Sequence, residues 1–164
     1  MARTEAAIRN AIIGALSTSS MLTTLGLNSA ESILDRNIDL YLPELRAEKL
    51  YTTLVSGQKK RIRAWAVEVF FSEQPRATGN INIRNYNINV IAYYEPEDVN
   101  TMLEHSRKVV NAIRLLGHNI SSTLASISSG SISEPSLVET DDDDIDKYVT
   151  MTLSWEGYDD IAEY

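Results

Sequence analysis

Cysteine is absent from the 164 residues of this chain. Without thiols, the chain can hold no disulfide framework, no thiolate metal site and no cysteine nucleophile. Histidine is nearly absent as well: only His105 and His118 occur, and neither lies in a metal-ligand pattern such as HExxH. Redox chemistry and zinc fingers are therefore excluded, and the two histidines are read as ordinary surface or half-buried residues.

Glycine is scarce, and none of the seven glycines falls into the GxGxxG or GxxxxGK spacing of a phosphate-binding loop. Serine is common, but there is no GxSxG motif and no histidine placed to act as its base. No apolar run approaches the roughly 18 residues of a membrane span. The first residues are interrupted by Arg3, Glu5 and Arg9, unlike a signal peptide. We therefore expect the protein to stay in the compartment where it is made.

The composition that remains is that of a folded domain. Hydrophobic residues make up 43% of the chain and charged residues 23%, which is close to the globular average. We expect a single domain over residues 1–164. Within it we expect a helical N-terminal portion at 1–44, a sheet-and-helix core at 45–156 and an acidic C-terminal tail at 157–164.

The net charge of −8 argues against a general nucleic-acid binder, because such proteins need a basic surface. The charge is also unevenly distributed. Residues 1–63 carry a net charge of +3, whereas residues 64–164 carry −11. This asymmetry suits the subunit of a heterologous ring, in which each copy must offer two different and complementary surfaces.

Hydrophobic periodicity predicts an α+β fold: a mainly antiparallel β-sheet of four to five strands packed against an N-terminal helix and a long helix near residues 96–116. In chain order, the predicted elements are a helix at Glu5–Leu16, a strand pair at 49–55 and 61–71, a long strand at 80–94, the long helix, and closing strands near 137–139 and 149–155.

Several local expectations accompany this fold. Asn28 and Ser29 are possible caps of a helical turn around Ile33 and Leu34, and Pro43 is expected to close that segment. The stretch 74–80 is expected to be an exposed loop.

The long strand is expected to extend past the body of the sheet, because it is longer than a usual strand. Its apolar positions change parity between Ile83 and Tyr86, which predicts a bulge near Arg84 and Asn85.

The long helix is expected to end at Gly117. Its predicted core-facing residues, which should meet the layer of Trp65, Val67, Val69 and Phe71, are Val99, Leu103, Val110 and Ile113.

One charged motif is a candidate interface. The basic run Lys59–Arg63 is suited either to solubilise an edge strand or to dock on an acidic neighbour. The residues taken as a possible subunit or partner interface are Lys59, Lys60, Arg61, Arg63 and Arg84.

A second charged motif is acidic and consists of Asp141, Asp142, Asp143, Asp144 and Asp146. Hard cations favour several carboxylates, but the glycine and glutamate positions of an EF-hand are missing here. Successive residues of an extended chain also point to opposite sides. A solvated turn is therefore favoured over an ion site, and neither metal nor cofactor is expected. In an assembly, the turn would line a lumen and repel DNA phosphates, or meet a cationic interface.

The order of the predicted elements resembles a known family. The run Tyr86–Tyr94, the pair Glu95-Pro96 and the long helix after it follow an N-terminal helix and a hairpin, and two closing strands complete the pattern. This order is similar to that of the tail terminator or tail completion proteins of tailed bacteriophages. The likeness covers roughly residues 45–156 and assigns no residue a chemical role.

The resemblance implies a structural virion protein, and not an enzyme, that forms a hexameric ring in the phage neck, caps the tail tube and joins the tail to the head. It also implies a homo-oligomer whose partners are tail tube and neck or connector proteins, with DNA only as passing cargo and no membrane. The implied location is the virion, after assembly in the host cytoplasm.

Alternatives stay open at this point. The segments 21–42 and 119–136 are larger than that core requires, which leaves room for another head-to-tail connector or head completion ring. A small ligand-binding or regulatory α+β domain would need a closed apolar pocket. A metal-dependent hydrolase would need the acidic run to converge on an ion.

Overall fold

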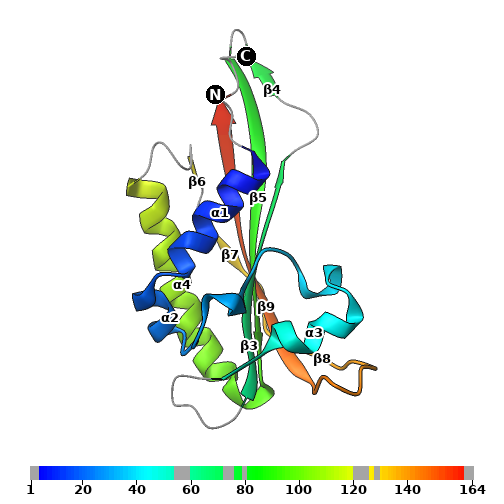
Figure 1. The fold of residues 1–164 in the computed structure, drawn as a ribbon. Helices are drawn as coiled ribbons and strands as arrows, with labels where there is room; N and C mark the ends of the chain where they lie inside the picture. Colours follow the sequence, from blue (N-terminus) through cyan, green and yellow to red (C-terminus); the bar gives the residue numbers. More distant parts are fainter. Residues whose placement is uncertain are drawn as a thin grey trace.

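Three long strands form the centre of the molecule and run along its length (Figure 1). They are β3 (Lys60–Phe71), β5 (Ile81–Tyr94) and β9 (Tyr148–Asp160), and each neighbouring pair is antiparallel. This computed structural model describes residues 4–53, 60–71, 76–78, 81–119, 126–127 and 130–160. Together with the helices below, the sheet confirms the predicted α+β class.

Short strands extend this sheet on both sides. They are β1 (Ile33–Leu34), β2 (Tyr51–Thr53), β4 (Arg76–Thr78), β6 (Ser126–Ile127), β7 (Ser131–Ile132) and β8 (Ser136–Val138). Strands β1 and β2 pair with the outer edge of β3, β4 pairs with β5, and β6, β7 and β8 pair in turn with β9. Of these pairings, only that of β1 with β3 is parallel.

The helices begin at recognisable capping signals. They are α1 (Glu5–Leu16), α2 (Ser19–Thr24), α3 (Pro43–Leu50) and α4 (Val99–Asn119), with short 3-10 turns η1 (Ala30–Ser32), η2 (Ile38–Leu40) and η3 (Pro96–Asp98). The hydroxyls of Thr4, Thr18 and Ser29 accept bonds from backbone N–H groups in the first turns of α1, α2 and η1, as N-caps do.

The sheet separates two hydrophobic clusters. One face, the helix-covered face, carries Trp65 and Val67 and packs against α1 and α4; we call the opposite face, which carries Ala64 and Ala66, the second face. The core of the helix-covered face includes Ile8, Ile12, Leu16, Trp65, Val67, Tyr86, Ile88, Val90, Met102, Val109, Ile113, Met151 and Leu153. The core of the second face includes Leu34, Ile38, Leu50, Ile62, Ala64, Ala66, Ile91, Tyr93, Ile145 and Tyr148. Figure 1 shows α1 and α4 on one side of the strands and α3 on the other.

Helix α4 confirms the predicted position and three of the four predicted core contacts: Ile113 is buried, and Val99 and Val110 pack against the same core. Its buried residues are Met102, Ser106, Val109 and Ile113, whereas Leu103 is 40% exposed. Leu103 therefore does not face the core as the sequence predicted. The apolar positions of this helix span more than one face, so periodicity alone did not fix which stripe meets the sheet. The helix also continues past Gly117 to Asn119.

The predicted bulge near Arg84 and Asn85 is wrong for the pairing with β9. The register of β5 with β9 is unbroken from Ile83 opposite Asp160 to Tyr94 opposite Val149. Both strands extend beyond α1 and α4 at one end of the molecule (Figure 1). Strand parity is strongly constrained only where a layer packs on the sheet, so a change of apolar parity there needs no inserted residue.

Some predicted boundaries also shift. Pro43 opens α3 instead of closing the preceding segment, because proline suits a first helical turn. The predicted strand at 49–55 begins at Tyr51, and its end and the turn after it lie outside the described residues.

Other segments also differ from the sequence expectations. Ser29 caps a turn as expected, but Ile33 and Leu34 form β1. Within the predicted loop 74–80, residues 76–78 form β4, and β9 continues through Asp160 into the predicted tail.

Candidate functional site

The basic run is held within the chain by the acids that precede α4. Arg61 lies 2.9 Å from Glu97 and 3.1 Å from Asp98, and Arg63 lies 3.1 Å from the same Asp98 oxygen. The backbone N–H of Ile62 donates to Glu95 at 3.1 Å. The acids just before α4 suit the positive end of the helix dipole, and they also bind the start of β3.

Arg63 is the buried member of this group of ion pairs. Its side chain is 7% exposed, its guanidinium lies 4.8 Å from the centre of the Tyr94 ring, and it donates to the carbonyl of Leu25 at 3.5 Å. Gly26 adopts φ +70°, and a Cβ at that position would lie 2.7 Å from Arg63 Nη1. A glycine is needed there both for its left-handed backbone and for the room that it leaves to the guanidinium.

The Tyr94 ring next to this arginine belongs to a chain of hydrogen bonds in the core. Trp65 Nε1 donates to the Tyr94 hydroxyl at 3.1 Å, and this hydroxyl lies 2.7 Å from His105 Nδ1. Because the tyrosine oxygen accepts from the tryptophan, its own proton is available to the imidazole, which favours a neutral histidine protonated on Nε2. Burial raises the pKa of Tyr94, and burial followed by the charge of Arg63 lowers the pKa of His105. The tyrosine and the histidine are both held neutral, as suits a structural network.

The predicted basic interface is therefore not presented as a single patch. Arg61 and Arg63 are engaged by Glu97 and Asp98, and only Lys60 of the run is exposed among the residues that the structure describes. Lys59 lies outside the described residues. The backbone of Arg84 lies in β5 opposite Asp159, and its side chain is outside the described part of the chain.

The acidic run forms a surface turn attached to β2. The hydroxyl of Tyr51 donates to the Asp146 carboxylate at 3.3 Å and accepts from the Asp146 N–H at 3.1 Å. Inside the turn, the Asp144 N–H donates to the Asp142 carboxylate at 2.9 Å. Ile145 is buried in the second-face core, so its side chain attaches the turn to the sheet. Asp141 and Asp143 are exposed.

No group of three or more histidine, aspartate or glutamate side chains in the described part of the chain is arranged to hold a metal ion. None of the described helices combines the length and the apolarity that crossing a bilayer would require.

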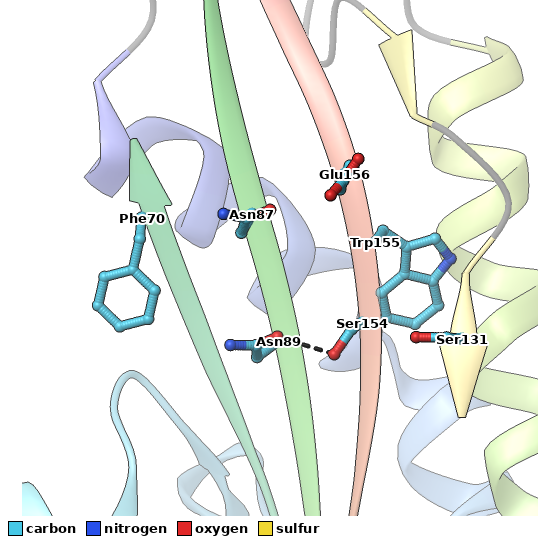
Figure 2. A pocket seen from close by; sticks show the side chains of 7 residues that line it. All are labelled: Phe70, Asn87, Asn89, Ser131, Ser154, Trp155 and Glu156. Carbon is cyan, nitrogen blue, oxygen red and sulfur yellow. Dashed lines mark hydrogen bonds between the residues drawn. The ribbon is translucent and has the colours of Figure 1, made fainter. Parts of the chain in front are cut away.

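Half of the second face is not covered by any helix or loop among the described residues. The sequence alone did not identify this surface as a candidate site. Two rows of side chains cross β3, β5 and β9 there, and cross-strand pairs set them side by side. One row is Glu68, Asn89 and Ser154, and the other is Phe70, Asn87 and Glu156. We call these six residues the open half-face. Figure 2 shows five of the six residues, all but Glu68, and the bond from the Ser154 hydroxyl to the Asn89 side-chain oxygen, which is 2.9 Å long.

The open half-face is a shallow depression and not a closed pocket. Its volume is about 450 Å³, with Ser131 and Trp155 at one rim (Figure 2). Gly130 is required at this rim, because a Cβ there would lie 2.5 Å from Trp155 Nε1. Phe70 is 49% exposed, and Asn87 is exposed as well. Small-molecule sites are more enclosed and mostly apolar, so this surface is better suited to a macromolecular partner.

No protein-family model matches this chain, and no curated protein matches it. The functional argument therefore depends on the surfaces of the molecule itself.

A second exposed surface lies on the far side of the sheet, on α4. The stripe opposite the buried residues of this helix is exposed and consists of Leu103, Glu104, Arg107, Lys108, Asn111, Arg114 and Leu115. We call it the outer face of α4. Arg107, Lys108 and Arg114 form no ion pair with any other residue in the described part of the chain. This face is basic, whereas the open half-face carries two carboxylates.

Part of this site was readable in the sequence. The alternation of Asn87 and Asn89 with Ile88 and Val90 already predicts a strand with one polar face. The strand alternation over residues 61–71 also puts Phe70 on the face opposite Trp65, but nothing local to Phe70 indicates whether another element covers it. The exposure of Leu103 on the outer face of α4 has no local signal, because it depends on how the helix packs on the sheet.

Proposed function

We propose that the chain is a structural virion protein that forms a ring in the neck of a tailed bacteriophage, capping the tail tube and joining the tail to the head. The proposal extends the resemblance described above, and the α+β fold is compatible with it. The ring is taken to be hexameric, as the resemblance implies. Its neighbours are tail tube and neck or connector proteins, and DNA passes through the ring without specific binding.

The observation that carries the proposal is the unequal cover of the sheet. Helices α1 and α4 pack over one face, while half of the other face is left open and polar. The chain thus offers two unlike surfaces on opposite sides: the open half-face and the outer face of α4. A subunit of this kind is suited to heterologous contacts, which generate closed rings when the rotation between copies closes.

The arrangement of the titratable groups also supports a structural role. The polar side chains of Arg63, Tyr94 and His105 are already engaged with one another and with Asp98 and Trp65. The carboxylates nearest to it are engaged by arginines. An acid–base catalyst needs a group within reach of a substrate, and the open half-face offers only amides, a serine and separate carboxylates.

The proposal is tested by locating the protein in particles. Antibody raised against the purified chain would carry gold labels onto tailed particles from cells infected by the phage that encodes it. We expect the label at the junction of head and tail. We also expect particles made without the chain to separate into unjoined heads and tails. Label along the tail shaft, on the capsid shell or on no particle would overturn the proposal.

The defect of particles made without the chain distinguishes a tail terminator from other rings of the neck. Loss of a tail terminator leaves heads that are complete and filled with DNA, together with tails that cannot attach. Loss of a head completion ring leaves heads that lose their DNA, beside normal finished tails. The second result would move the chain to the head side of the neck, where the alternative places it.

A further inference from the structure

The two exposed surfaces of the chain are complementary in charge and in composition. The open half-face carries the carboxylates of Glu68 and Glu156 beside the exposed ring of Phe70. The outer face of α4 carries three cations, Arg107, Lys108 and Arg114, and a single carboxylate, Glu104.

The apolar residues of the two surfaces also match. Leu103 and Leu115 on the outer face of α4 are 40% and 58% exposed, and Phe70 on the open half-face is 49% exposed. Protein interfaces are enriched in aromatic residues and arginine, with apolar contacts at the centre and polar groups around them. Asn87 and Asn89 add amide groups that can bond to guanidinium donors. Each surface thus supplies what the other lacks.

The geometry of α4 gives the basic surface one direction. Successive residues of a helix turn by about 100°, so Leu103, Arg107 and Arg114 form one stripe and Glu104, Lys108 and Leu115 lie beside it. The buried residues Met102, Val109 and Ile113 point toward the sheet, and the middle of the exposed surface, between these two stripes, lies opposite them. The outer face of α4 as a whole therefore faces away from the body, on the side of the sheet opposite the open half-face.

We propose that the outer face of α4 in one copy of this chain docks on the open half-face of the next copy. The occupant of each surface is thus a second copy. Because the two surfaces are different and lie on opposite sides of the sheet, the contact is heterologous and leaves a free surface of each kind for further copies. This inference rests on the proposed ring, whose subunit contact it specifies.

Cross-linking tests the contact directly, because the chain contains no cysteine. A variant carrying Phe70→Cys and Leu103→Cys, treated with a short bismaleimide, should give a ladder of covalent trimers and larger species. Each single variant should give almost no product, because like surfaces do not meet. The matched control pair is Leu42→Cys with Leu137→Cys, two leucines of similar exposure that lie off both surfaces. The reaction is run on the purified protein and on assembled particles.

The outcomes separate the inference from the proposed function. A ladder with Phe70→Cys and Leu103→Cys, but not with the control pair, supports the contact. A ring that is present in particles but gives no ladder with this pair, or gives one with the control pair, overturns the contact and leaves the ring in place. Dimers from a single variant would show that like surfaces meet, which also overturns it. Absence of the chain from the neck would overturn the proposed function itself.

Charge exchange gives an independent test. Glu68→Lys and Arg107→Glu should each weaken self-association by at least about tenfold, measured by sedimentation of the purified protein or of its complex with neck partners. The double variant should recover most of this loss. Lys60→Glu, at an exposed cation of the predicted basic run, serves as the control and should assemble normally.

The same variants exclude other occupants. If Arg107→Glu impairs retention or passage of DNA while self-association is unchanged, the outer face of α4 serves DNA and the proposal is wrong. If Lys60→Glu blocks assembly and Arg107→Glu does not, the basic run is the interface, and the proposal is equally wrong. Circular dichroism spectra and melting temperatures matching those of the unmodified protein would establish that each variant is folded.

Discussion

Two neighbouring positions on β5 show how differently one face of the sheet is used. Ile91 and Asn89 are two residues apart and point to the same side, yet Ile91 is 7% exposed in the second-face core, whereas Asn89 belongs to the open half-face. The difference lies in what covers them. The elements η2 and α3 contribute Ile38 and Leu50 to the core around Ile91. A single strand thus serves stability in one half and remains available for contacts in the other.

Charged residues follow the same division. Arg63 on the covered side is buried and has an ion-pair partner, an aromatic ring and a carbonyl around it. Glu68 in the open half is partly exposed and forms no bond with another described residue. A buried charge needs its own partners, whereas a charge in contact with water does not. A covered charge on this sheet therefore depends on its partners within the fold, whereas a charge in the open half is available to another molecule.

The largest effect should follow from removing the partner of the buried charge. Asp98→Ala leaves Arg63 buried without a carboxylate, and should lower the free energy of unfolding by about 3 kcal/mol. The matched control is Glu97→Ala, since Glu97 is 74% exposed although it also pairs with Arg61. Its loss should be less than about 1 kcal/mol. Denaturation with urea measures both values, and equal losses would contradict the distinction between covered and open charges.

A smaller effect should separate the two positions on β5. Ile91→Ala removes buried methyl groups from the second-face core and should cost about 2 kcal/mol, the low end for such a truncation, because Ile91 is not completely buried. Asn89→Ala removes the acceptor of the Ser154 hydroxyl at a partly exposed site, and should cost less than about 1 kcal/mol. The free energies of unfolding of the two variants are compared by chemical denaturation. A loss for Asn89→Ala as large as that for Ile91→Ala would show that the open half-face also belongs to the stable core.

The smallest effect concerns pH. Because burial lowers the pKa of His105 in the folded state, the unfolded chain binds its proton more readily. Stability should therefore be complete above the ordinary histidine value of 6.5 and should decrease as the pH falls below it. His105→Asn keeps an acceptor near the position of Nδ1 but cannot be protonated.

Unfolding titrations between about pH 8 and pH 5 should show a shallower pH dependence for His105→Asn than for the unmodified chain. His118 remains in both proteins and provides the internal control for histidines in general. Identical slopes in the two proteins would mean that His105 is not held neutral by its surroundings.

Much of the framework could be predicted from local patterns. The bounds of α1, the inward layer of Trp65, Val67, Val69 and Phe71 and the closing strand near 149–155 agree with the structure. Such predictions succeed because the side-chain period of a helix or strand depends only on the residues within it. The bulge and the inward placement of Leu103 were wrong because both depend on which layer lies opposite.

The sequence by itself determined the α+β class, the lack of cysteine chemistry and the long antiparallel strands, since composition and periodicity are properties of the chain alone. The tertiary structure alone decided that Arg61 and Arg63 are engaged by Glu97 and Asp98, and that the rows of Glu68 and Phe70 stay uncovered. These outcomes depend on packing between segments far apart in the sequence. No local sequence pattern shows how far α3 and η2 extend over the second face. The open half-face is the part of the sheet that they do not reach.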